Sequence, residues 1–269
     1  MKALIGTHDV LFITLDSLRF DVAQLAHLTG ATPAISHYLP AEGWQKCHAP
    51  GTFTYPSHQA FFAGFLPTPS NAAKHTRLFA AQFAGSTTTH ETTFTFSEAD
   101  LPAALSARDY HTVCIGGVGF FNKRPPLGTQ FPALFAESFW DPAMGVASRH
   151  STECQVNKAL NVMQKLPLEK PMLLFINVSA THSPTHIFTT AQKDSLETQG
   201  AALAYADSHL GRLFAAMTLR RPALVILCAD HGEAFGEDGF FGHRLAHPTV
   251  WEVPYTQFIL QGPPCFSHS

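Results

Sequence analysis

The chain has 269 residues, of which 45% are hydrophobic and 14% are charged, and its formal net charge at pH 7 is -3. This length allows one large α/β domain or two small ones, and the composition is that of a globular, soluble protein. The sequence contains no basic run and no basic amphipathic helix, which argues against a nucleic-acid or anionic-membrane partner. It also contains no stretch of ~18 uninterrupted apolar residues, so we expect no membrane span.

Two features of the sequence predict its location. His8 and Asp9 stand where a signal peptide would have its apolar core. The five cysteines form no Cys-x-x-Cys pair, and reduced, mostly buried thiols fit a cytosolic protein better than a disulfide framework does. We therefore expect an unexported, cytoplasmic protein.

The first apolar run, residues 10–15, has the length of a strand and ends at Asp16. A nearly continuous run of this kind predicts a central parallel strand that carries Asp16 at its carboxyl end. Residues 48–64 form a turn-rich loop that enters a short helix, and Pro56 suits the first turn of that helix. Thr54 is therefore expected beside a helix N-terminus, whose free N–H groups attract an anion.

Two further apolar runs end in polar side chains. Residues 171–178 predict a strand followed by His182, and residues 223–227 predict a strand that leads to Asp230 and His231. The remaining expected elements are helices over 20–28, 97–108 (with Ser97 and Asp100 at capping-box spacing), 148–165 and 196–219, strands over 110–115 and 255–260, and surface loops with a strand or two over 66–97.

Strands alternate with helices along the whole chain, which predicts βαβ units. We therefore expect an α/β fold in which a mostly parallel central sheet is sandwiched by helices. No linker, repeat or charge block divides the sequence, so a single domain over residues 1–269 is the simplest interpretation.

The polar residues at the strand ends predict a metal site, because ligands bind outside the carboxyl ends of the strands in open α/β sheets. Asp16, Asp230 and His231 offer carboxylate oxygens and an imidazole nitrogen to a divalent cation, and Thr54 Oγ would be a further ligand. A metal lowers the pKa of a threonine hydroxyl, so that the alkoxide can attack. Zn²⁺ and Mn²⁺ suit this ligand set best, with Mg²⁺ or Ca²⁺ as alternatives. Glu233 is expected to orient His231.

Four motifs occur in a fixed order: Leu-Asp-Ser-Leu-Arg at 15–19, Thr-Tyr-Pro-Ser at 54–57, Thr-His-Ser-Pro at 181–184 and Asp-His-Gly-Glu at 230–233. Together they resemble the alkaline phosphatase superfamily, most closely its sulfatase-like and phosphoethanolamine-transferase-like branch. The similarity extends over nearly the full length of the chain.

The resemblance implies a role for each matching residue. The family's metal ligands match Asp16, Asp230 and His231. Its nucleophile, which forms a covalent phospho- or sulfo-enzyme, matches Thr54. The resemblance further implies that His182 contacts the transferred or leaving group, and that His243 contacts the charged oxygens of the substrate.

The departures from the family pattern narrow the expected chemistry. Sulfatases mature a Cys or Ser to formylglycine within a motif that continues x-Pro-Ser-Arg, whereas this chain has Thr54 and, at the Arg position, His58. The Gly-Gly-Val-Gly stretch at 116–119 lies where sulfatases carry a Lys and a His for sulfate. A true sulfatase is therefore disfavoured, and phosphoryl transfer through a threonine is favoured.

The expected number of metals follows from a second departure. Alkaline phosphatases hold a second metal with an Asp-x3-His pair, but the residue four positions before His182 is Val178. We expect one metal per chain, with His182, His243 and His247 as the alternative ligands of a second. The chain also ends where the small C-terminal domain of sulfatases would begin, so the core is expected without that subdomain.

These observations predict a metal-dependent hydrolase or transferase that acts on a small-molecule phosphate ester through Thr54. The alternative is a non-catalytic metal- or anion-binding relative that keeps the fold and serves as a partner in a pathway. Each residue also has a structural alternative: Asp16 and Thr54 as helix caps, and His182 and His243 as surface residues. The sequence leaves the natural substrate and the oligomeric state open.

Overall fold

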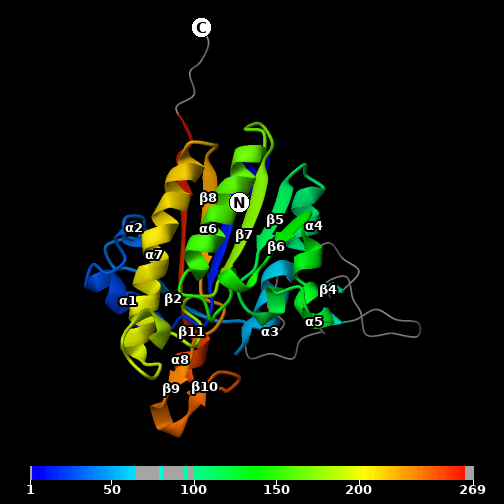
Figure 1. The fold of residues 1–269 in the computed structure, drawn as a ribbon. Coiled ribbons are helices and arrows are strands. Elements are labelled where there is room, and N and C mark those ends of the chain that lie inside the picture. Colours follow the sequence, from blue (N-terminus) through cyan, green and yellow to red (C-terminus); the bar gives the residue numbers. More distant parts are fainter. Residues whose placement is uncertain (1, 65–78, 81–93, 96–99, 264–269) are drawn as a thin grey trace, which may run out of the picture.

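The main sheet carries seven strands in the order β2-β11-β8-β1-β7-β5-β6 (Figure 1). The computed structural model describes residues 2–64, 79–80, 94–95 and 100–263. The strands are β1 (Asp9–Leu15), β2 (Gln45–His48), β5 (His111–Ile115), β6 (Glu137–Phe139), β7 (Met172–Val178), β8 (Ala223–Cys228) and β11 (Glu252–Leu260). Strands β8, β1, β7, β5 and β6 run parallel, and β11 is antiparallel to both of its neighbours. The predicted mostly parallel sheet is confirmed.

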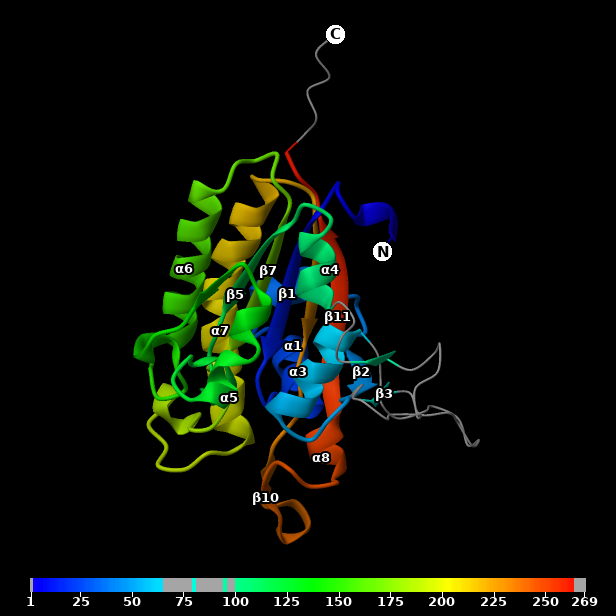
Figure 2. The same ribbon diagram turned by 90° about the vertical axis from the view of Figure 1, so that its right-hand side faces the viewer.

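Helices cover both faces of this sheet (Figures 1 and 2). One face packs against α1 (Phe20–Leu28), α2 (Pro33–Ser36), α6 (Ser151–Lys165) and α7 (Leu196–Thr218), and the other faces α3 (Thr54–Ala63) and α4 (Leu101–Ser106). The shorter elements are α5 (Pro126–Thr129), α8 (Pro248–Trp251), β3 (Phe79–Ala80), β4 (Phe94–Thr95), β9 (Ala234–Phe235) and β10 (Phe241–Gly242). None of the helices in the described part of the chain is both long and apolar enough to cross a bilayer.

Strand β1 is buried at every position because both of its faces are covered. Its side chains alternate between two cores, since successive residues of a strand point to opposite faces. Leu11 and Ile13 pack toward α7, whereas Val10 and Phe12 join an aromatic cluster on the side of α3. A central strand that serves two cores must be apolar throughout, as the sequence of β1 is.

Local signals fix the ends of the helices. Helix α7 begins with a capping box in which the Ser195 side chain accepts from Thr198 N and the Thr198 side chain accepts from Ser195 N. At the start of α4, Asp100 Oδ1 accepts from Ala103 N at 2.8 Å, while its predicted partner Ser97 lies outside the described residues. These caps pair N–H groups that lack partners within the helix.

The sequence prediction missed two strands, β2 and β6. Both are short, and neither contains an apolar run, because the side chains of β2 and β6 are only partly buried or exposed. The last strand begins at Glu252, three residues before the predicted Tyr255. The predicted loops over 66–97 lie mostly outside the described residues.

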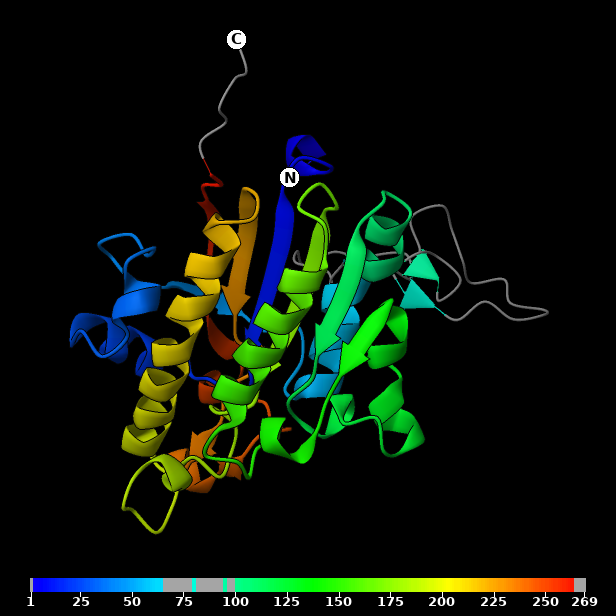
Figure 3. The same cartoon turned by 45° about the horizontal axis from the view of Figure 1, so that its top comes forward.

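The carboxyl ends of the parallel strands share one end of the sheet. In Figure 3 their arrowheads point the same way, and the orange segment that contains β9, β10 and α8 lies at that end. Residues that follow β1, β7 and β8 are therefore brought together, although they are far apart in sequence.

Candidate metal and catalytic site

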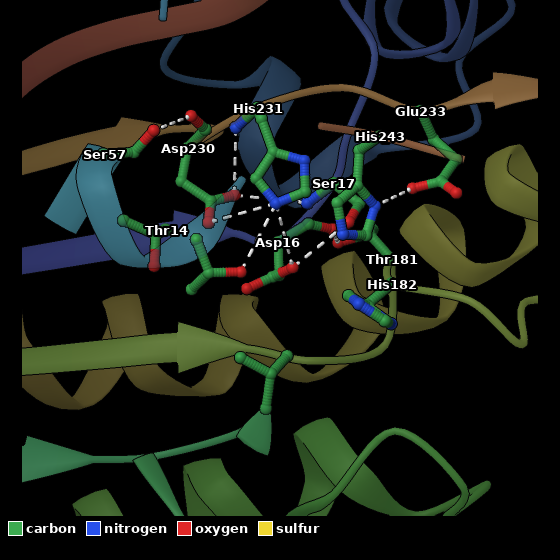
Figure 4. Close-up of polar contacts among 12 residues, drawn as sticks. Thr14, Asp16, Ser17, Ser57, Thr181, His182, Asp230, His231, Glu233 and His243 are labelled. Atoms are coloured by element: carbon green, nitrogen blue, oxygen red, sulfur yellow. Dashed lines mark hydrogen bonds and ion pairs between the residues drawn. The ribbon is translucent and has the colours of Figure 1, made fainter. Parts of the chain in front are cut away.

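Asp16, Asp230 and His231 form a buried cluster at the carboxyl end of the sheet. Their potential ligand atoms lie within 4.8 Å of one another, and the described residues contain no other such group of three or more His, Cys, Asp or Glu. His231 Nε2 is 3.6 Å from Asp230 Oδ2 and 3.8 Å from Asp16 Oδ1. Figure 4 shows the His231 ring between the two carboxylates. The predicted ligands thus converge, and their role as metal ligands stays a prediction.

The Asp230 carboxylate has one satisfied and one unsatisfied oxygen. Oδ1 accepts from the backbone N–H groups of Ser17 at 3.2 Å and His231 at 3.1 Å. Ser17, which donates the first of these bonds, has a left-handed φ of 62°, which a non-glycine residue adopts at an energetic cost. Oδ2 is buried and has no hydrogen-bond partner among the described residues. A buried carboxylate oxygen without a partner is costly, and a cation at this position would remove that cost.

The Asp16 carboxylate is held by neutral donors on both oxygens. Ser17 Oγ donates to Oδ1 at 3.1 Å, and Asn177 Nδ2 donates to Oδ2 at 2.9 Å. The backbone carbonyl of Asp16 also accepts from Thr181 Oγ1 at 2.7 Å. The carboxylate is therefore fixed in position before any metal is bound.

The two carboxyl groups have opposite pKa shifts. Burial, and then the charge of Asp16, raise the pKa of Asp230 well above its ordinary value. Burial also acts to raise the pKa of Asp16, but the neighbouring His182 and His231 and the bond from Asn177 lower it overall. Two buried carboxylates this close repel each other when both are charged, and a divalent cation between them would allow both to ionise.

His231 presents a neutral nitrogen to the carboxylates. Its Nδ1 lies 2.9 Å from the Gly232 carbonyl oxygen, which can only accept, so Nδ1 carries the proton and Nε2 is free of one. Burial lowers the pKa of His231 to about 3, so the ring is neutral at physiological pH. A neutral imidazole with its second nitrogen fixed by a backbone carbonyl is the usual form of a metal ligand.

Thr54 is the first residue of α3 and is 2% exposed. Its Oγ1 lies 3.4 Å from His231 Nε2. The N-cap of α3 is Phe53, which makes no side-chain cap, so the Thr54 hydroxyl does not serve as the cap of its own helix. The hydroxyl instead faces the candidate metal ligands, as its predicted role as nucleophile requires.

His182 and His243 lie beside this cluster, with ring centroids 5.8 Å apart, and His243 is 4.5 Å from the His231 ring (Figure 4). His182 Nδ1 is 2.6 Å from the Ser183 carbonyl oxygen, and His243 Nδ1 is 2.7 Å from Glu233 Oε2. Each ring therefore keeps Nε2 available. The prediction that Glu233 orients His231 is wrong, because Glu233 contacts His243 while the Gly232 carbonyl holds His231.

A pocket of about 320 Å³ opens from Thr54, His182 and His243. Its other lining residues are Val118, Gly119, Phe120, Asn122, Pro125, Leu127, Gly128, Val146 and Arg244. A ligand in this pocket would contact the candidate nucleophile at one end and apolar side chains along its walls.

Sequence reasoning undervalued a hydrogen-bond chain beneath the site. His58 Nδ1 is 2.8 Å from the Thr54 carbonyl oxygen, and His58 Nε2 is 3.1 Å from Thr14 Oγ1. Asn177 Nδ2 donates to Thr14 Oγ1 at 3.2 Å as well as to Asp16. The signal in the sequence was a polar residue in each of two apolar strands, Thr14 and Asn177, which are register partners in the sheet.

Two other residues that the sequence singled out do not join the site. His247 has both ring nitrogens engaged, Nδ1 with Thr249 Oγ1 at 2.7 Å and Nε2 with Asp238 at 3.1 Å. Arg19 forms ion pairs with Asp21 and Glu237. The alternative of a second metal held by His182, His243 and His247 therefore gains no support from the position of His247.

Comparison with solved structures finds proteins of similar fold. The chain is similar to the C-terminal periplasmic domain of phosphoethanolamine transferase EptC from Campylobacter jejuni (13% identity, TM-score 0.62, covering 94% of this chain and 80% of that chain). It is also similar to the soluble domain of lipooligosaccharide phosphoethanolamine transferase A from Neisseria meningitidis (16%, 0.64, 94% and 76%) and to the lipoteichoic acid synthase LtaP from Listeria monocytogenes (14%, 0.61, 98% and 67%). These likenesses establish the fold.

Sequence comparison gives the family. No curated protein matches the sequence significantly. The family model described as Sulfatase matches residues 8–257, which is most of the chain. The predicted sulfatase-like branch of the alkaline phosphatase superfamily is thereby confirmed, and the chain belongs to the sulfatase family.

Proposed function

We propose that this protein is a metal-dependent enzyme that cleaves or transfers a phosphate ester through Thr54. The observation that carries the proposal is the position of the Thr54 hydroxyl, 3.4 Å from His231 Nε2 and at the end of a pocket lined by His182 and His243. Asp16, Asp230, His231 and Thr54 would hold one divalent cation. When bound, the cation would lower the pKa of the Thr54 hydroxyl and offset negative charge on the phosphoryl group.

Zinc is the first choice of cation. The donor set of two carboxylates and a neutral imidazole fits Zn²⁺ and Mn²⁺, and the similar EptC domain from Escherichia coli was solved as a complex with Zn. The buried, unpartnered Asp230 Oδ2 is consistent with a cation at this place.

The proposed reaction has two steps. In the first, Thr54 Oγ forms a bond to phosphorus while the bond from phosphorus to the leaving oxygen breaks. The hydroxyl proton of Thr54 passes to solvent, and the leaving oxygen takes a proton from Nε2 of His182 or His243 in its imidazolium form. In the second, the oxygen of water or of an acceptor alcohol bonds to phosphorus and the Thr54 ester breaks. The incoming oxygen loses its proton to the histidine, which restores the imidazolium, and Thr54 regains its proton from solvent.

We propose phosphate rather than sulfate as the transferred group because of the residue at the nucleophile position and the residues that line the pocket. Thr54 cannot mature to formylglycine, which removes the sulfatase route. The pocket that opens from Thr54 is lined by no lysine among the described residues. A threonine can form a phosphate ester by the same displacement that serine nucleophiles use.

The test compares wild type with Thr54→Ala and Thr54→Ser on chromogenic phosphate monoester, phosphate diester and sulfate ester, with Zn²⁺ or Mn²⁺ supplied. Phosphoester turnover should be lost in Thr54→Ala and partly kept in Thr54→Ser, which retains a hydroxyl. Zinc should still bind to Thr54→Ala through the three remaining ligands. Full turnover by Thr54→Ala would refute the covalent mechanism.

A mass measurement tests the intermediate directly. Brief incubation with substrate followed by acid quenching should add one phosphoryl group to the wild-type chain, located on the peptide that contains Thr54. The Thr54→Ala chain should gain none under the same conditions. A phosphorylated peptide elsewhere in both proteins would contradict the assignment of the nucleophile.

A further inference from the structure

The pocket beyond Thr54 contains an arginine in an unusual position. Arg244 follows His243 directly and lines the same pocket. Its backbone N–H donates to the Thr52 carbonyl at 2.8 Å, and its guanidinium lies 5.4 Å from the ring centroid of Phe53. The backbone of Arg244 is thus hydrogen-bonded to the segment that precedes Thr54, and its guanidinium lies near the Phe53 ring.

The charge of Arg244 has no ionic partner within the described part of the chain. The residue also has a left-handed φ of 71°, which disfavours any side chain other than glycine. No carboxylate appears among the described residues that line the pocket. The pocket therefore offers a cation, two histidines and no anion to whatever binds there.

Most of the other residues that line the pocket are apolar. The Phe120 ring packs against Tyr55 at 5.4 Å and against Phe53 at 6.4 Å. Val118, Val146 and Leu127 also line the pocket, and Leu127 is 48% exposed. The apolar part of an organic group would bury surface against these side chains, which favours binding.

We infer that the substrate is a phosphate ester whose organic group has an apolar part and carries a second anionic group bound by Arg244. This inference rests on the proposed function, since it places the transferred phosphoryl group at Thr54. A planar guanidinium can donate two parallel hydrogen bonds to a carboxylate or to a second phosphate, so either anion could bind at Arg244. An ammonium-bearing group such as phosphoethanolamine is disfavoured, because it would meet Arg244 and no carboxylate.

The experiment measures binding of non-hydrolysable probes to the zinc-loaded protein by calorimetry, so it does not depend on turnover. The probes share a benzylphosphonate body and differ at the para position: hydrogen, carboxylate, a second phosphonomethyl group, or aminomethyl. The wild type should bind the two anionic probes about three- to tenfold more tightly than the neutral one, as expected of a partly exposed charge pair, and the aminomethyl probe most weakly. The tighter anionic probe identifies the class of the second group.

Three variants isolate the contribution of Arg244. Arg244→Gln should bind all four probes with similar affinity, and Arg244→Glu should prefer the aminomethyl probe. The control Arg108→Gln changes an exposed arginine before β5, at the opposite end of the sheet, and should keep the wild-type order.

Two results would overturn the inference. If the wild type binds all probes equally, or prefers the aminomethyl probe, Arg244 does not select an anion, while the proposed function stands. If no probe binds the zinc-loaded protein at all, both the inference and the phosphate-ester site fail.

Discussion

Asn177 is the residue on which the position of Asp16 depends. Its Nδ2 donates to Asp16 Oδ2 at 2.9 Å, and its Oδ1 accepts from Val118 N at 3.0 Å. Asn177→Ala should weaken zinc binding by about 10- to 100-fold, the usual effect of removing a group that orients a metal ligand. Calorimetric titration with Zn²⁺ measures this, with Asn161→Ala on the exposed side of α6 as the matched control. An Asn177→Ala protein with wild-type zinc affinity would show that Asp16 needs no such support.

His58 makes the stability of the folded protein depend on pH in the acid range. Burial lowers its pKa from 6.5 to about 4, against the opposing effects of the Thr54 carbonyl and the Asp16 charge. The unfolded chain therefore binds a proton more readily than the folded one. The resulting stability is present above pH 6.5 and is lost as the pH falls toward 4.

Replacing His58 should flatten that dependence. Between pH 7 and pH 5, His58 accounts for about 2 kcal/mol of the decrease in the free energy of unfolding of the wild type. The decrease in His58→Gln should therefore be smaller by about 2 kcal/mol. Urea denaturation of the metal-free proteins at the two pH values measures the difference. His231 titrates in both proteins and cancels in the comparison. Equal losses in wild type and His58→Gln would mean that His58 is not held neutral by its surroundings.

At the residue scale, sequence identified the side chains that can bind a metal but not those that hold them. Asp16, Asp230 and His231 could be named because each follows a strand-length apolar run. The pairing of Thr14 with Asn177 depends on which strands are neighbours, and nothing local in the sequence specifies this. The partner of Glu233 was mistaken for the same reason: His231 is two residues away and His243 is ten, yet the loop fold brings the farther one into contact.

At the scale of elements, prediction succeeded where burial is complete. Strands β1 and β7 are buried along their whole length and were found from apolar runs alone. Strands β2 and β6 lie at the two edges of the sheet, where part of each strand faces solvent and the sequence keeps polar side chains. Their presence follows from pairing with β11 and β5, a long-range property that a local pattern does not carry.

A buried ion pair ties three elements together at the end of the sheet opposite the site. Asp9, at the start of β1, pairs with Arg220 Nε at 2.9 Å and accepts from Met172 N of β7 at 2.9 Å, and Arg220 directly follows the C-cap of α7. Burial raises the pKa of Asp9, against the opposing charge of Arg220. Arg220→Leu removes the closer of the two cations beside that carboxylate and leaves Arg221 Nε at 3.6 Å, so it should lower the free energy of unfolding by up to about 3–5 kcal/mol.

The double variant Asp9→Asn/Arg220→Leu should recover part of this loss, because no buried carboxylate charge then remains, and Arg221 is partly exposed. Lys46→Ala breaks an ion pair whose side chains are 49% and 42% exposed, and it should cost less than about 1 kcal/mol. Denaturant titration ranks the proteins. A cost for Arg220→Leu no larger than that for Lys46→Ala would show that the buried pair contributes little.

At the scale of the whole molecule, the convergence of the site could be predicted because parallel strands place their carboxyl ends together. The walls of the pocket could not, since Phe120, Leu127 and Val146 come from loops and short helices between β5 and α6 whose path depends on tertiary packing. The cytosolic location and the single-domain organisation stay predictions.

Asp230 links the metal to the stability of the whole fold. Burial and the charge of Asp16 raise its pKa, so in the metal-free protein the folded chain holds a proton that the unfolded chain releases. Stability therefore falls as the pH rises through the window between the unfolded and the folded pKa, and zinc bound to the ionised carboxylate would offset this loss.

Asp230→Asn should separate these effects. Without metal at pH 7, the variant should be at least as stable as the wild type, because its neutral amide needs neither to take up a proton on folding nor to bury a second charge beside Asp16. With free zinc at about 1,000 times the dissociation constant, the wild type should gain about 4 kcal/mol, whereas Asp230→Asn should gain far less. Denaturation with zinc and with a chelator measures both, and Asp238→Asn, whose side chain is 81% exposed, is the control that should follow the wild type. A metal-free Asp230→Asn protein that is clearly less stable than wild type, and that zinc stabilises equally, would mean that Asp230 is a structural residue and not a metal ligand.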